Sequence, residues 1–383
     1  MAQTIIEASP ALLSFAGNPI VYKVSTDKSL GDDESFLRIV CKAVFSLNGS
    51  VAGYTGSVTF TDEQSQPVGD RGTAVFNLSE SAKTLIRNIQ SGIDMNSGDA
   101  LSSYGIKANV EFKAVWLYEN NEYSTDVEAA PVIYIVPGGL TDYEMITMGD
   151  IYLPSLTGNG REMTRKPDGG IVYAGEKVIV PTLRGIDSAD KTVTVSFMVS
   201  GSEIYRSSDI IEGFKLDYQT ASPENESVEG EFVFNSSLTG PITGYYRTNT
   251  SGVYFLRFIN GFGAVENISV RSREKLSYEV SGETHSLVQQ ISTRPTDRRY
   301  ATKSQPVGVY ELSSGYVPRR WAEWYVQELL TSTRVWIQIG GKWVPALIEA
   351  EDDCVIYDRS KPGMPHVDFT LRLAIDGVTG VVW

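Results

Sequence analysis

The side chains that most often do chemistry near neutral pH are scarce in this chain of 383 residues. His285 and His366 are its only histidines, and neither has a Cys or His neighbour at a metal-ligand spacing. A nucleophilic triad also needs a base, most often histidine, beside the nucleophile. We therefore expect both histidines to be ordinary polar residues, and the sequence predicts no catalytic triad and no metal or other cofactor.

Phosphate and nucleotide chemistry have no motif here either. The sequence contains no Gly-x-Ser-x-Gly elbow, no Gly-x-Gly-x-x-Gly after a strand and no Gly-x-x-x-x-Gly-Lys cradle. Its 33 Lys and Arg against 47 Asp and Glu give a formal charge of -14, which repels a phosphate backbone. Nucleic acid is therefore not an expected partner.

Carboxylates are the one abundant reactive group, and a glycosidase needs only two of them a short distance apart. The densest group is the run Glu349-Ala350-Glu351-Asp352-Asp353, whose spacing matches no calcium loop. A solvated turn is the favoured interpretation, and a cation site or a catalytic pair are the alternatives. Cys41 and Cys354 stand far apart in the sequence, and we expect two small buried hydrophobes rather than a disulfide.

Tryptophan and arginine gather in the last third of the chain. The candidate interface residues are Trp321, Trp324, Trp336, Trp343, Arg319 and Arg320. A helix stripe packed on a hairpin explains the tryptophan spacing as core, which is the favoured interpretation. A protein interface anchored on one or two of these rings and a platform for sugar rings are the alternatives.

Positive charge is concentrated just before these tryptophans, although the whole chain is acidic. The residues are Arg271, Arg273, Lys275, Arg294, Arg298, Arg299, Lys303, Arg319 and Arg320. Subunits that assemble head to tail or in a ring can use such an asymmetry to set their register. Ordinary solvated charge is the alternative interpretation.

These residues must be positioned mainly by strands. Thr192–Val199 and Val367–Leu373 alternate polar and apolar residues, which is typical of strands with one buried face. Gly340-Gly341 between Trp336–Ile339 and Lys342–Val344 predicts a hairpin with a two-residue turn. Two short helices are expected, one capped by Ser79 and ended by Gly92, the other beginning near Pro318.

This pattern predicts a mainly β protein of tandem antiparallel β-sandwich, Ig-like domains with two short helices. We place an N-terminal β-sandwich domain at residues 1–137, because a strand-like run there ends in Pro137-Gly138-Gly139. A middle β-sandwich domain is expected at 138–270. A C-terminal β-rich domain at 271–383 would hold the Trp-rich helix and the hairpin.

Three stretches resemble structural proteins of phages and prophages from gut Bacteroidota. They are Ser9–Tyr22, Tyr254–Glu266 and Val335–Gly377, at both ends and the middle of the chain. The resemblance implies β-sandwich modules in a virion component of the tail, tail tip or baseplate. It brings no catalytic residues and no cofactor.

The expected function is therefore that of a non-enzymatic virion structural protein. It would form a homo-oligomer and contact other virion proteins through its third domain. The alternative is an adhesin or receptor-binding module for a host surface glycan, and a carbohydrate-degrading tail enzyme is a third class. The sequence shows no cleaved signal and no apolar membrane segment, so we expect synthesis in the host cytoplasm, no membrane insertion and localisation in the virion.

Overall fold

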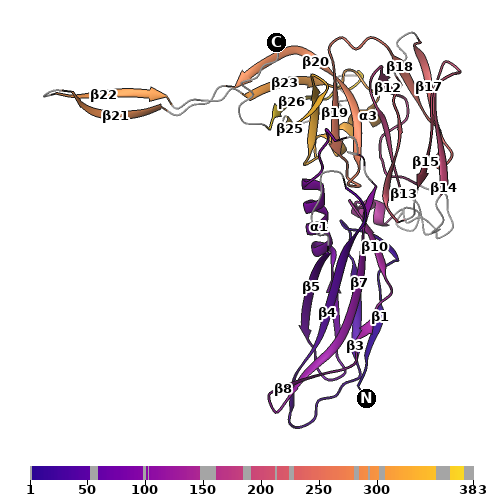
Figure 1. Ribbon diagram of the computed structural model, residues 1–383, viewed down its shortest axis with the longest axis vertical. Helices are drawn as coiled ribbons and strands as arrows, with labels where there is room; N and C mark the ends of the chain where they lie inside the picture. The colour runs from indigo at the N-terminus through magenta and orange to yellow at the C-terminus, as the bar shows by residue number, and fades with distance from the viewer. Residues whose placement is uncertain are drawn as a thin grey trace.

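The computed structural model describes residues 2–51, 59–97, 101, 103–146, 161–183, 191–211, 214–223, 228–279, 284–291, 294–301, 307–350 and 363–374. These residues form mainly β-strands with short helices, which confirms the predicted class. An N-terminal unit stands below a barrel and a middle unit, and one hairpin projects to the side (Figure 1).

The N-terminal unit packs a small sheet against a large one. The small sheet has the order β1-β3-β6, and β7 lies at the centre of the large sheet, paired with β4, β8, β9, β10 and β16. Rings of Tyr22 and Phe76 in the small sheet lie 5.3 and 5.8 Å from the ring of Phe112 in β7. The core between the two sheets is thus filled by aromatic side chains, as in a sandwich. The bounds are β1 Thr4–Ala8, β2 Leu13–Phe15, β3 Val21–Thr26, β4 Glu34–Gly49, β5 Thr59–Pro67, β6 Thr73–Asn77, β7 Tyr104–Tyr118, β8 Asn121–Ser124, β9 Glu128–Ala129 and β10 Ile133–Val136.

The first predicted helix is α1, Ser79–Ser91, and it buries Ala82, Leu85, Ile86 and Ile89. Its cap differs from the prediction. Ser79 is the first helical residue rather than the cap, and its backbone N–H donates to Oδ1 of Asn77 at 3.1 Å. The side chain that satisfies the helix start therefore lies two residues earlier than expected.

The middle unit is a second sandwich. One sheet has the order β12-β18-β17-β14-β15, and β11, β13 and β16 continue the large sheet of the N-terminal unit through the pair Leu216↔Tyr104. The predicted alternation of residues 192–199 holds, because Val193, Val195, Phe197 and Val199 are all buried. Pairing is not antiparallel throughout, since β12 runs parallel to β18 and β10 parallel to β2. The bounds are β11 Arg161–Glu162, β12 Gly170–Tyr173, β13 Val178–Leu183, β14 Lys191–Val199, β15 Ser202–Ile211, β16 Leu216–Ala221, β17 Gly230–Ser236 and β18 Ile242–Arg247.

The C-terminal unit is a closed barrel in the order β19-β20-β23-β26-β25-β24. The expected domain boundary at 270 falls inside β20, and β19 pairs with β24 as well as with β20. The barrel therefore begins at Val253, because β19 and β20 close it rather than finishing the middle sandwich. By contrast, β10 ends at Val136, next to the expected boundary at 137. The bounds are β19 Val253–Ile259, β20 Val265–Glu279, β23 Val307–Ser313, α3 Arg319–Trp324, η1 Tyr325–Leu329, β24 Val335–Ile339, β25 Lys342–Ala350 and β26 Asp368–Leu373.

Two sequence predictions for this unit are confirmed. Gly340 and Gly341 have φ angles of 56° and 78°, which a two-residue primed turn between β24 and β25 requires. The second predicted helix begins directly after Pro318 as α3 and continues as the π-helical turn η1. Both elements bury apolar side chains in the barrel core.

A two-stranded hairpin, here called the arm, projects from the barrel. It consists of β21, Thr284–Ile291, and β22, Arg294–Ala301, which pair with each other and with no third strand in the described residues. The arm leaves the barrel where β20 and β23 end their pairing at Glu279↔Val307. Figure 1 shows it extending well away from the rest of the chain.

Candidate functional site

The structure places three of the four predicted tryptophans in core positions. Trp321 and Trp324 lie in α3, with ring centroids 5.4 Å apart in an edge-to-face pair, and Trp324 also packs edge-on against Phe258 of β19. Both are buried, and so is Trp336. These three side chains therefore belong to the core, and their ring faces are not available to bind another chain.

Trp343 lies at a contact between the barrel and the N-terminal unit. The guanidinium of Arg257 lies over its ring, 4.1 Å from the centroid. Asn96, from the loop after α1, accepts from the backbone N–H of Trp343 at 2.7 Å and donates to its carbonyl at 2.9 Å. This tryptophan is thus an interface residue within one chain.

The two predicted arginines lie at the exposed start of α3. Arg319 is paired with Glu323 one turn later, at 2.7 Å, and Arg320 is exposed. Of the other basic residues, Arg271 lies at the surface of β20. Two of them, Arg273 and Lys275, fall in β20, and three more, Arg294, Arg298 and Arg299, fall in β22. The structure describes the backbone of these five residues but not their side chains, and Lys303 lies outside the described residues.

A cleft between the middle unit and the barrel brings together Arg271 and an arginine that the sequence did not single out, Arg247. Arg271 donates to the hydroxyl of Tyr173 at 3.3 to 3.4 Å, and Tyr173 in β12 is the register partner of Arg247 in β18. The cleft has a volume of about 420 Å³, and Tyr316 and the largely buried Trp321 also line it. We call this group the basic cleft. Glu229 lines a neighbouring pocket together with both arginines, and its pKa is lowered by hydrogen bonds from Thr248 and by the charge of Arg247.

A cluster of buried charges joins the units on another side. Arg165 donates to Glu144 at 2.6 Å and to Glu328 of η1 at 2.6 Å, and its guanidinium lies 4.0 Å from the ring centroid of Phe262. Glu328 also accepts from the backbone N–H of Gly261 at 2.6 Å. Burial by itself would raise the pKa of Glu144, but hydrogen bonds from Arg165 and Thr141 outweigh it and hold that pKa below its ordinary value. We call Glu144, Arg165 and Glu328 the junction triad.

Two further glutamates are buried, and for both of them burial outweighs the opposing charge of Lys166. Burial raises the pKa of Glu266 to about 7, against opposing effects of Lys166 and of Asn260, whose amide donates to it. Burial also raises the pKa of Glu176, which contacts the hydroxyl of Ser269. An acid–base site needs such groups in contact with a ligand. Neither glutamate lines the basic cleft itself, although Glu176 is hydrogen-bonded to Tyr173 and Ser269, which do.

Replacing Glu266 by Gln is expected to change how stability depends on pH. Native Glu266 keeps its proton up to about pH 7, whereas the unfolded chain releases it near 4.5. The native state therefore binds more protons in this window, and this group lowers the free energy of unfolding as pH rises from about 4.5 to about 7. Glu266→Gln should be progressively more stable than wild type across that window in urea unfolding. The exposed-site change Glu231→Gln is the control, and its difference from wild type in the free energy of unfolding should not change with pH. If the difference for Glu266→Gln also stays constant with pH, the assignment is contradicted.

The remaining candidates for chemistry form no site in the described residues. His366 lies 3.4 Å from Asp368, at the surface, and His285 falls in β21 with its side chain outside the described set. Glu349 of the acidic run lies 3.4 Å from Arg372 across β25 and β26, while residues 351–353 and Cys354 lie outside the described residues. Cys41 is buried as predicted, and burial raises its pKa to about 12. Among the described residues no group of three or more His, Cys, Asp or Glu is placed to hold a metal.

Within the same residues, no helix is both long enough and apolar enough to span a bilayer. The sequence matches no family model, and no curated protein matches it. Solved structures of multidomain β proteins are similar to this chain at low identity. The FN1–FN3 domains of chicken CNTN1 are 9% identical and the match covers 82% of this chain and 94% of that one, with a TM-score of 0.19.

Two other similar structures are of the same kind. The titin domains I67–I69 are 8% identical over 82% of this chain and 93% of theirs, with a TM-score of 0.18. Fibronectin(III)-like modules of Clostridium thermocellum CbhA are 14% identical over 64% of this chain and 94% of theirs, with a TM-score of 0.14. At TM-scores this low, the architecture is defined by the chain's own strand pairing and not by these likenesses.

Proposed function

We propose that this protein is a non-enzymatic structural component of a phage virion, in the tail, tail tip or baseplate, that assembles through contacts with other copies and with neighbouring virion proteins. The observation that carries the proposal is the arm. An isolated two-stranded hairpin is marginally stable in water, and both of its edges present unpaired backbone groups. A hairpin that projects from a closed barrel is therefore best explained by a partner that covers it.

The basic cleft supports the same function from a second direction. The whole chain carries a formal charge of -14, yet Arg247 and Arg271 stand exposed beside aromatic rings in one cleft, with Glu229 in the neighbouring pocket. Acidic surface on a neighbouring subunit is the complement of such a cleft, and complementary charge sets register and speeds encounter. The sequence resemblance to structural proteins of Bacteroidota phages is what supports a virion as the setting of this assembly.

Mass measurement tests the proposal. Light scattering on the purified protein is expected to give a discrete homo-oligomer rather than a monomer, and mass spectrometry of purified particles should detect the chain. Raising the salt concentration should shift the solution equilibrium toward smaller species, because ion pairs between subunits are screened at high ionic strength. A strictly monomeric protein at all concentrations and salts, together with its absence from purified particles, would refute the assignment.

A further inference from the structure

The pairing of β4 with β7 contains a bulge at the end of the N-terminal unit. Ser35 is the partner of Leu117 and Arg38 the partner of Val115, so that Phe36 and Leu37 together oppose one residue of β7. Leu37 is only 2% exposed, whereas Phe36 is 77% exposed and has a φ angle of 54°. A bulky residue rarely adopts that backbone conformation, because its Cβ crowds the carbonyl. The bulge thus holds a strained backbone that turns an aromatic ring to solvent.

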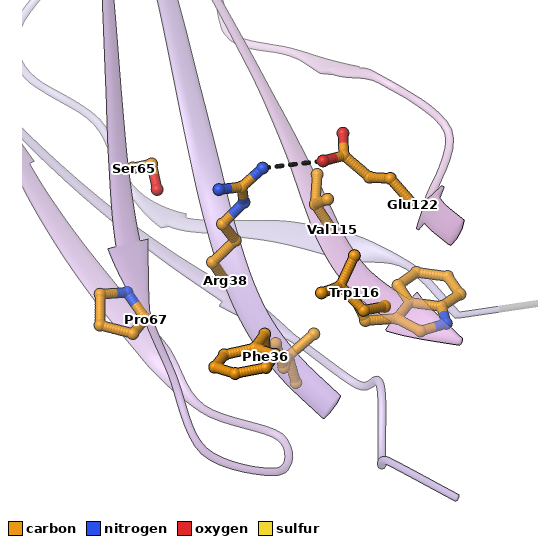
Figure 2. Close-up of a pocket in the computed structure, with 9 residues that line it drawn as sticks. Phe36, Arg38, Ser65, Pro67, Val115, Trp116 and Glu122 are labelled. Carbon is orange, nitrogen blue, oxygen red and sulfur yellow. Dashed lines mark hydrogen bonds and ion pairs between the residues drawn. The ribbon is translucent and has the colours of Figure 1, made fainter. Parts of the chain in front are cut away.

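The ring of Phe36 forms one wall of an open pocket of about 430 Å³, which Figure 2 shows between β4, β5, β7 and β8. Pro67 and Ser65 of β5 lie across from it. Above the ring, Nη2 of Arg38 donates to Oε2 of Glu122 at 2.9 Å, and these side chains are 44% and 53% exposed. The pocket therefore combines an exposed aromatic face with a charged pair that keeps free donor and acceptor positions.

The ring of the neighbouring Trp116 is already in contact with other side chains of the protein. Trp116 stacks on Tyr123, with centroids 6.4 Å apart, and the ammonium of Lys28 lies 4.6 Å from the centroid of its ring. Phe36 has no such partner ring among the described aromatic pairs. It is the aromatic face in this pocket that is left for a ligand.

We propose that this pocket binds a neutral pyranose ring. The apolar C–H face of the sugar would pack on Phe36, and two adjacent hydroxyls would donate to Glu122 and accept from Arg38. A neutral ligand is favoured because the two charges compensate each other, so the pocket offers no net charge to an anion or a cation. The site differs from the tryptophan cluster in which the sequence suggested a sugar platform. Figure 1 places β8 at the end of the N-terminal unit remote from the arm, so the pocket stays accessible when the arm is covered, and the inference is independent of the proposed assembly.

Saturation-transfer NMR with methyl pyranosides of glucose, galactose, mannose and N-acetylglucosamine at millimolar concentration tests the site. At least one of these sugars should receive saturation at its ring C–H protons from the wild-type protein. Phe36→Ala should weaken that binding by roughly tenfold or abolish it, in keeping with the loss of an aromatic contact. Phe60→Ala is the matched control, since Phe60 is a partly exposed aromatic of the adjacent strand β5 that does not line the pocket.

Phe36→Gly separates a binding role from a folding role. Glycine adopts a φ of 54° without strain, so this variant should melt at the same temperature as wild type or higher while losing sugar binding. The proposal is overturned if none of the four sugars receives saturation from the wild-type protein, or if their binding survives in both Phe36 variants. A lowered melting temperature of Phe36→Gly would also overturn it, because the ring would then be needed for packing. Binding of an apolar peptide at Phe36 with no response to any sugar would assign the pocket to a protein partner instead.

Discussion

Removing the arm is expected to abolish assembly while leaving the three units folded. Residues 280–306 would be replaced by Asn-Gly, which connects Glu279 of β20 directly to Val307 of β23. These two residues are already paired in the barrel, so a two-residue hairpin turn can join them without moving either strand. The shortened protein should run as a monomer by light scattering. Its far-ultraviolet circular dichroism should remain that of a β protein. Its melting temperature should stay within a few degrees of that of the wild type at high salt, where the oligomer is expected to dissociate.

A second variant serves as the control, because it keeps both strands of the arm and changes only the two residues that connect them. Ile291 and Arg294 are the last register pair of the hairpin, so replacing Ser292-Thr293 by Asn-Gly keeps a two-residue connection between them. This variant should assemble like wild type. If the shortened protein still forms the full oligomer, the arm does not mediate assembly and the proposed function loses its main support. Unfolding of the shortened protein would instead mean that the arm belongs to the fold of the barrel.

Local sequence patterns predicted the elements whose conformation is decided by nearby residues. The Gly340-Gly341 hairpin and the alternating strand at residues 192–199 have these patterns because positive φ angles and a period of two are local properties. The start of α1 was displaced for an equally local reason, since Asn77 also has a side chain that can bond a free backbone N–H. Such competition between neighbouring polar residues cannot be resolved from their types alone.

Barrel closure could not be predicted in the same way. The pairing of β19 with β24 joins residues near 257 and 336, and it depends on tertiary contacts that the alternation along either strand does not encode. The boundary expected at 270 was misplaced for this reason, since an apolar strand pair fits a sandwich or a barrel equally well. The arm likewise leaves no local signal, because the sequence of a hairpin does not say whether a sheet lies beside it.

The candidate sites were the hardest part to predict. Tryptophan spacing identified a core, and the favoured interpretation of the cluster as a helix packed on a hairpin agrees with the burial of Trp321, Trp324 and Trp336. Arg247 and Phe36 carried no signal. Arg247 is brought to Arg271 by strand pairing across a unit boundary, and Phe36 is exposed only because of a one-residue bulge. A bulge shifts side chains between faces of a sheet, so an alternation count without the register assigns them to the wrong face.

Replacing Arg165 by Met should destabilise the protein by about 3–5 kcal/mol, the cost typical of removing one partner from a buried ion pair. Methionine keeps much of the apolar length that lies against Phe262, so the main loss is charge and hydrogen bonding. The carboxylates of Glu144 and Glu328, which are 12% and 3% exposed, would then lie beside each other without a cation. Urea unfolding followed by tryptophan fluorescence measures the change, because α3, which holds Trp321 and Trp324, runs directly into η1, which holds Glu328.

The matched control is Arg319→Met, which removes an exposed arginine from its pair with Glu323 and should cost no more than about 1 kcal/mol. Adding Glu328→Gln to Arg165→Met should restore part of the lost stability, because the uncompensated buried charge is then gone. Coupling of this kind is expected only if the three side chains act as one network across the junction. If Arg165→Met costs no more than Arg319→Met, the junction triad is solvated in solution. The contact between the N-terminal unit and the barrel must then be held by the packing of Trp336 and Trp343 and by hydrogen bonds such as those of Asn96 with Trp343 and of Arg334 with the Gln90 carbonyl.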